Sequence, residues 1–176
     1  MRSIYVVRHS AREPHEPHLS LPGVRMARAQ GELLGPMARV CSSPALRCIE
    51  TVVALGCAVQ EECDALALPD DDALAMEFDL IGSFADAVRQ IEHGTYMPAY
   101  ARSLRTFVES IAEELYDHED ALLVTHGGVV EVLTALLAGA DATAKLGMGV
   151  GFCDGVRLII DNDGVSDHWT VQRLCT

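Results

Sequence analysis

Two histidines in this chain each stand directly after a short apolar run. His9 and the preceding Arg8 follow the run at residues 4–7, and His126 follows the run at 121–124 after a single threonine. Short runs rich in Val, Ile and Leu are typical of strands buried on both faces of a sheet. Because ligands of open α/β sheets bind at the carboxyl ends of the strands, we expect these three side chains to meet there. Imidazole and guanidinium groups at one edge would suit a small anionic substrate.

The charge of the chain limits its partners. Its formal net charge is −13 and its isoelectric point is about 4.8. An acidic field of this size repels phosphate backbones, which argues against a nucleic acid or an anionic membrane as partner. A small anionic substrate would need a local positive pocket, and Arg8 and Arg47 are the candidates to form it.

The length of 176 residues predicts a single domain over 1–176, in which roughly 70% of the surface of the unfolded chain can be buried. No apolar stretch approaches the roughly 18 residues that a transmembrane helix needs, and the chain starts with a strand pattern. We therefore expect a soluble, cytoplasmic protein.

The chain has six cysteines, none of them in a Cys-x-x-Cys pair. Without an export signal, buried or free thiols are expected rather than a disulfide framework or a metal site. The six are Cys41, Cys48, Cys57, Cys63, Cys153 and Cys175.

Strand and helix patterns alternate along the chain, which indicates a layered α/β domain. A strand at 4–8 is followed by a helix from Ser20 to about residue 34, with Pro22 in its first turn. A second strand is expected at 39–41. Ser43 is predicted to cap a helix that begins at Pro44 and ends near residue 55, and a third strand is expected at 58–60.

The middle of the chain, from 61 to 94, is the least regular part, with a helix expected over 83–92. An amphipathic helix over 100–116, a strand over 121–125 and a helix over 129–137 follow. The pattern of the last residues predicts a terminal hairpin, with strands at 156–160 and 168–174 and a turn at 161–164.

Three segments carry a recognisable pattern. They are Val-Arg-His-Ser at 7–10, Cys-Ser-Ser-Pro-Ala-Leu-Arg-Cys-Ile-Glu-Thr at 41–51 and Leu-Val-Thr-His-Gly-Gly-Val-Val at 123–130. In this order they resemble the Arg-His-Gly, Ser-Ser-Pro-Leu-x-Arg-Ala-x-Gln-Thr and Ser-His-Gly-Gly motifs of the histidine phosphatase superfamily, the phosphoglycerate mutase-like proteins. The length of the chain is similar to that of the small phosphatases of this superfamily.

The resemblance implies a three-layer α/β/α sandwich with a mostly parallel sheet and one antiparallel edge strand. It implies a metal-independent phosphohydrolase without a cofactor, acting through a phosphohistidine on a small phosphorylated metabolite or a phosphohistidine protein. Both monomers and homodimers occur in this family. The alternatives are a phosphomutase of the phosphoglycerate mutase type, whose relatives are usually longer, and a phosphate-binding regulatory module without turnover.

Within this resemblance His9 is the expected nucleophile, because a neutral imidazole can attack phosphorus and divide a very high barrier into two steps. Arg8 and Arg47 would disfavour protonation of His9 and hold phosphoryl oxygens through forked hydrogen bonds. His126 is expected to contact the transferring phosphoryl group, with Gly127 and the following glycine allowing close approach of the backbone. Arg12 could add a positive charge at the rim of the pocket.

The proton donor to the leaving group is less well marked. Relatives with a general acid carry a Glu or Asp in the middle of the chain, a few residues before a glycine, and the stretch at 75–82 resembles that segment. Glu77 is therefore the expected acid, with Asp79 and Asp72 as alternates. If Glu77 lies far from His9, the substrate class shifts toward phosphohistidine or another activated phosphate.

Overall fold

The computed structural model describes residues 1–162 and 167–174 and forms a six-stranded sheet in the order β3-β2-β4-β1-β5-β6. Strands β1, β4, β2 and β3 run parallel, whereas β5 is antiparallel to β1 and β6 is antiparallel to β5. The strand bounds are Arg2–Arg8 (β1), Arg39–Ser42 (β2), Glu61–Glu62 (β3), Asp120–Thr125 (β4), Gly155–Asn162 (β5) and Asp167–Arg173 (β6). The predicted mostly parallel sheet is confirmed, and its antiparallel edge is a hairpin in which β5 lies inside β6.

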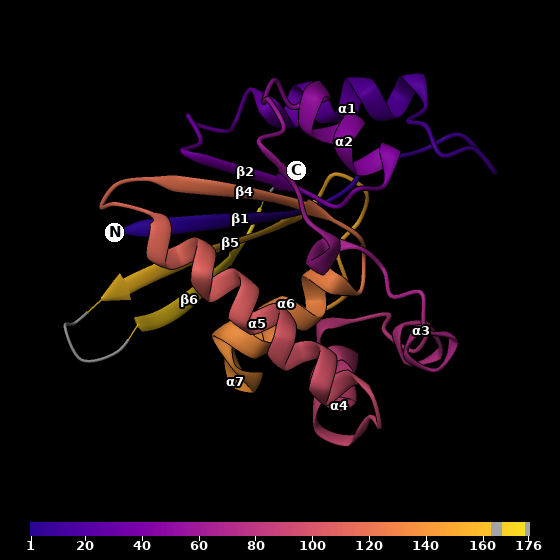
Figure 1. Cartoon of the computed structure of the whole chain (residues 1–176), viewed down its shortest axis with the longest axis vertical. Helices are drawn as coiled ribbons and strands as arrows, with labels where there is room; N and C mark the ends of the chain where they lie inside the picture. Colours follow the sequence, from indigo (N-terminus) through magenta and orange to yellow (C-terminus); the bar gives the residue numbers. More distant parts are fainter. Residues whose placement is uncertain (163–166, 175–176) are drawn as a thin grey trace.

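Helices cover both faces of the sheet (Figure 1). Helices α1 (Leu21–Gly31) and α2 (Leu46–Ala54) lie on one face, and α5 (Met97–Glu114), α6 (Val129–Ala138) and α7 (Ala140–Thr143) lie on the other. Helices α3 (Asp72–Phe78) and α4 (Phe84–His93) complete the set, with short 3-10 turns at Asp64–Leu66 and Ala144–Leu146. The predicted three-layer arrangement is confirmed.

The central strands are buried because each face of the sheet packs against helices. Five of the six residues of β4 are buried, and its side chains are divided between two apolar clusters on opposite faces. Alternate β4 residues thus contact α5 and α6 on one side and α1 and α2 on the other. Within the described residues no helix is long and apolar enough to cross a membrane.

Several local predictions are confirmed. Ser20 caps α1, since its Oγ accepts the Gly23 N–H at 3.1 Å. The helices predicted at 83–92, 100–116 and 129–137 correspond to α4, α5 and α6, and the terminal hairpin is formed by β5 and β6. The turn predicted at 161–164 is wrong in its first half, because residues 161 and 162 continue β5 and pair with β6, and its second half lies outside the described residues.

Other local predictions are wrong. Helix α2 begins at Leu46, and Ala45 occupies the N-cap position without a side-chain hydrogen bond. Ser43 was expected there, but its hydroxyl contacts His126 instead. The third strand is formed by residues 61–62 and not 58–60. Helix α3 also lies in the part expected to be irregular, and its N-cap is Asp71, whose carboxylate accepts the Leu74 N–H.

Candidate active site

The parallel register of β1 and β4 brings the two histidines together. Arg8 pairs with Thr125, so that His9 and His126 leave the sheet at the same edge, and the His9 N–H donates to the Thr125 carbonyl at 2.8 Å. The two imidazole rings lie edge to face with their centroids 5.4 Å apart. Arg47 reaches them from the first turn of α2, which follows β2. The structure therefore assembles the four side chains that the three motifs singled out.

His9 is held in one tautomer. Its Nδ1 lies 2.8 Å from the carbonyl oxygen of Ser10, which can only accept, so Nδ1 carries the proton. The Nε of Arg47 donates to His9 Nε2 at 3.2 Å. The lone pair of Nε2 therefore points toward the guanidinium group, where a phosphoryl group would bind.

Arg47 connects the two imidazoles. While its Nε donates to His9, its Nη2 donates to His126 Nδ1 at 3.2 Å. The Nε2 of His126 lies 2.9 Å from the hydroxyl of Ser43. With Nδ1 accepting, His126 carries its proton on Nε2 and donates it to that hydroxyl. Because a hydroxyl can donate or accept, Ser43 also permits the other tautomer of His126.

Arg8 is fixed from three sides. Its Nη1 donates to the carbonyl of Val150 at 2.8 Å, and its guanidinium lies 4.4 Å from the centre of the Phe152 ring. A Cβ at Gly127 would lie 3.2 Å from this guanidinium, so a larger residue there would have to displace it by a few tenths of an ångström. Among the described residues the buried Nε of Arg8 has no hydrogen-bond partner. A buried donor of this kind fits a phosphoryl oxygen as acceptor.

The electrostatics of the site favour neutral imidazoles. Burial lowers the pKa of His9 to about 4, and the positive charges of Arg47, Arg8 and Arg12 act in the same direction, against the hydrogen bond to Ser10. Burial and the charge of Arg47 lower the pKa of His126 to about 3. Both rings are therefore neutral near pH 7, which leaves the Nε2 lone pair of His9 available for attack.

Glu131, on α6, supports the Arg8 side of the pocket. It is 3% exposed, and its two carboxylate oxygens accept the N–H groups of Gly128 and Val150, each at 2.7 Å. Since Val150 in turn accepts from Arg8, the carboxylate holds the segment that orients this guanidinium. Its charge also favours the charged form of Arg8, against the effect of burial, which lowers the pKa of Arg8.

These groups line a pocket of about 530 Å³. Its lining includes the apolar side chains of Leu68, Ile81, Met148 and Phe152, while Arg12 is exposed and donates to the Glu16 carbonyl. The pocket is larger than a phosphate group needs, so part of a phosphorylated substrate can enter it. Among the described residues, Glu131 is the single carboxylate in its lining.

Glu77, the expected proton donor, does not line this pocket. Its carboxylate accepts the backbone N–H groups of Thr95, Tyr96 and Met97 at the start of α5, with shortest distances of 2.7 Å. These hydrogen bonds favour the charged form and lower the pKa of Glu77 against the opposing effect of burial. The structure therefore does not bring Glu77 to the pocket, because this carboxylate binds the backbone at the start of a helix. The alternates Asp72 and Asp79 are exposed and are likewise absent from the lining.

Three residues of the site were not predicted from the sequence as parts of it. Glu131 carries a signal, because it is the one charged residue in an otherwise apolar helix directly after the two glycines. The contact of Ser43 with His126 is masked by the sequence Ser-Pro, which resembles a helix start. Phe152 has no sequence signal, since an aromatic residue in a glycine-rich loop can serve many roles.

Comparison with known proteins agrees with this geometry. The sequence matches the histidine phosphatase superfamily (branch 1) over residues 4–173, so the chain belongs to this superfamily. No curated protein was found to match it.

Solved structures share the fold. A mycobacterial glucosyl-3-phosphoglycerate phosphatase in complex with VO3 superposes with a TM-score of 0.67 at 19% identity, covering 98% of each chain. A phosphoserine phosphatase from Entamoeba histolytica, in complex with 3-phosphoglyceric acid, gives a TM-score of 0.71 at 13% identity, covering 100% of this chain and 98% of that one. A structure described as the phosphohistidine phosphatase SixA from Agrobacterium tumefaciens gives a TM-score of 0.59 at 18% identity, covering 98% of this chain and 97% of that one. At these identities the likeness shows the fold alone.

Proposed function

We propose that the protein is a metal-independent phosphohydrolase that transfers a phosphoryl group to His9 and then to water. The observation that carries this proposal is the hydrogen bonding of His9: Nδ1–H is fixed on the Ser10 carbonyl, and the Nε2 lone pair faces the donors of Arg47. A neutral imidazole with this orientation is a nucleophile, and the guanidinium beside it is the natural partner of a phosphoryl oxygen.

In the first step the lone pair of His9 Nε2 forms a bond to phosphorus. The bond between phosphorus and the leaving group breaks, and its electron pair departs with that group. Phosphoryl oxygens accept from Arg8 Nε and from the N–H groups of Arg47, which then no longer bind the imidazoles. His126 can take its other tautomer by losing its Nε2 proton to solvent and gaining one from solvent at Nδ1; it then donates through Nδ1 while the Ser43 hydroxyl donates to Nε2.

In the second step a water oxygen attacks phosphorus, and the N–P bond returns its electron pair to His9 Nε2. The water gives its proton to solvent, and inorganic phosphate leaves. The Ser10 carbonyl keeps the proton of Nδ1 in place through both steps and stabilises the positive charge on the phosphorylated ring.

The pocket favours substrates whose leaving group needs little help from an acid. Glu131 is already bonded to two N–H groups, and Glu77 lies elsewhere. Phosphoramidates such as phosphohistidine, and other activated phosphates, meet this condition. A phosphohistidine protein or a small activated phosphate is therefore the substrate class that we favour over an alkyl phosphate ester.

A leaving-group series tests the function. Release of inorganic phosphate is measured with phosphohistidine, an aryl phosphate and an alkyl phosphate, for the wild type and for His9→Ala. We expect turnover in the order phosphohistidine, aryl, alkyl, and loss of all three activities in the variant. Equal rates for aryl and alkyl substrates would refute the leaving-group assignment. Binding of phosphate without any turnover would indicate a regulatory module, and phosphoryl transfer to a second metabolite in preference to water would indicate a mutase.

A further inference from the structure

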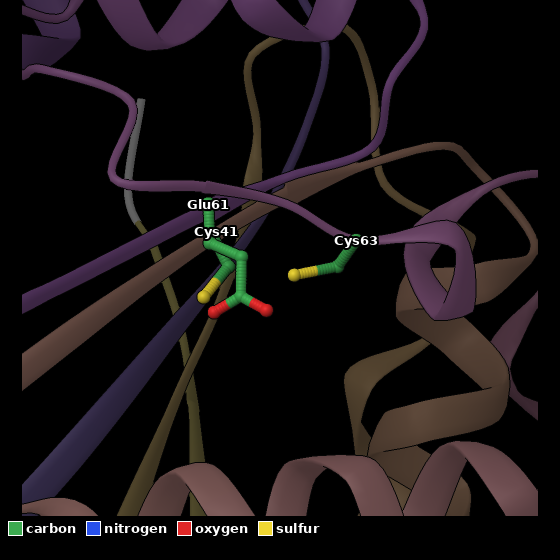
Figure 2. A group of neighbouring side chains, drawn as sticks. All are labelled: Cys41, Glu61 and Cys63. Carbon is green, nitrogen blue, oxygen red and sulfur yellow. The ribbon is translucent and has the colours of Figure 1, made fainter.

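A second group of reactive side chains lies at the edge of the sheet, away from the pocket. Figure 2 shows the thiols of Cys41 and Cys63 and the carboxylate of Glu61 pointing into one space. One ligand atom from each residue lies within 4.8 Å of the others. The grouping follows from the strand register: Cys41 pairs with Glu61 across β2 and β3, and Cys63 lies two residues further on the same face.

We infer that this group binds a thiophilic divalent cation of the zinc type through the two sulfurs and one carboxylate oxygen. Two thiolates and a carboxylate are ligands that Zn²⁺ accepts in tetrahedral sites, with water completing the fourth position. The sequence favoured free thiols, because the two cysteines are 22 positions apart and form no Cys-x-x-Cys pair. The parallel pairing of β2 and β3 makes them neighbours.

The charges around the group fit such a cation. Two thiolates and one carboxylate would leave one negative charge in excess over a divalent ion. Arg39 forms ion pairs with Glu61 and with Glu114, so a positive charge lies beside the group. Each thiol would give its proton to solvent when it binds.

A cation can reach this group from solvent, and the ligand atoms can move to bind it. Cys41 and Cys63 are 0% and 6% exposed, whereas the Glu61 side chain is 46% exposed and opens the group to solvent. Zn–S bonds of about 2.3 Å in a tetrahedron place the sulfurs about 3.8 Å apart, so the two sulfurs, now within 4.8 Å, would approach each other by at most about 1 Å. Strand β3 has two residues and pairs with β2 alone, so it can make this shift. The bound cation would then join β3 to β2, one residue before Ser42.

Cobalt titration of the chelator-treated, reduced protein tests the site. We expect one Co²⁺ per chain to produce thiolate-to-cobalt charge-transfer absorption, displaced by one equivalent of Zn²⁺. The band should be lost in Cys41→Ser and Cys63→Ser, retained in the control Cys57→Ser, and retained in His126→Ala, which excludes cation binding at the imidazoles. Absence of the band in the wild type, or its persistence in either of the first two variants, would overturn the inference.

Glu61→Gln tests the carboxylate ligand without disturbing the core, because this side chain lies at the surface. We expect its Co²⁺ affinity to fall about 10- to 100-fold, in the range typical of lost metal-site contacts. Zinc at about 100 times its Kd should raise the Tm of the wild type by roughly 5–10 °C and leave Cys63→Ser unchanged. Unchanged cobalt affinity in Glu61→Gln would remove the carboxylate from the site, and an unchanged Tm of the wild type would contradict a stabilising cation.

Discussion

The strand ends and the middle of the chain behave differently as sources of functional groups. Arg8, His9 and His126 lie at the ends of β1 and β4, and the register of these two strands fixes where the three residues lie relative to one another. The segment from 61 to 94 has two α-helices, a 3-10 turn and one two-residue strand, and its Glu77 accepts N–H groups at the start of another helix. The sheet therefore determines the positions of functional side chains at strand ends. The positions of side chains in the middle segment depend on tertiary packing, which a short sequence motif does not predict.

Removing Arg47 would do the most damage to the strand-end site. Arg47→Ala takes away both donors that face the imidazoles, and we expect kcat/KM to fall about 10²- to 10³-fold, as when a single oxyanion donor is lost. Steady-state kinetics with an aryl phosphate would measure this. Arg12→Ala is the matched control at the exposed rim and should change kcat/KM by less than about 10-fold; equal losses in the two variants would contradict the division of roles.

Acid should destabilise the free protein through the same site. The folded-state pKa of His9 is about 4, below the ordinary value of 6.5, so the unfolded chain binds protons first as pH falls. Stability is therefore lost between about pH 6.5 and 4, by roughly 3 kcal/mol from His9 alone. Urea unfolding at several pH values would measure this, and His9→Asn should flatten the slope. A slope that the variant leaves unchanged would locate the effect elsewhere.

Glu131→Gln would separate positioning from chemistry. The amide can accept only one of the two N–H groups that the carboxylate accepts, and the other would face an NH2 donor. We expect the free energy of unfolding to fall by about 1–3 kcal/mol and phosphate binding to weaken because Val150 no longer holds Arg8 in place. Unchanged stability together with unchanged phosphate affinity would show that this contact does not support the pocket.

The smallest effect is expected in the middle segment. Glu77→Gln should leave kcat on alkyl and aryl phosphates within about twofold of the wild type, because the carboxylate does not line the pocket. Stability should fall by about 0.5–2 kcal/mol, as for loss of a helix N-terminal acceptor, since one oxygen no longer binds the amides that start α5. A large, selective loss on the alkyl substrate would restore Glu77 as the acid.

The same difference explains which parts of the fold and of the site could be predicted from the sequence. The apolar runs before His9 and His126 indicated the central strands, and the motif at 41–51 indicated that Arg47 would join them. Ser43 was misassigned because a serine before proline suits a helix cap as well as a hydrogen bond to a distant imidazole. The position of Glu77 could not be predicted, because a carboxylate near a glycine can accept backbone N–H groups as readily as it can protonate a substrate. Both outcomes depend on partners that lie far away in the sequence.

The most direct test of the central claim is the detection of phosphorus on His9. The protein would be mixed with an activated phosphate, quenched within a turnover under conditions that preserve N–P bonds, and digested for mass spectrometry. A phosphoryl group on Nε2 of His9 that forms and decays at the rate of turnover is the predicted result. Turnover with no phosphorylated His9 at any quench time, or with the phosphoryl group on His126, would contradict the assignment.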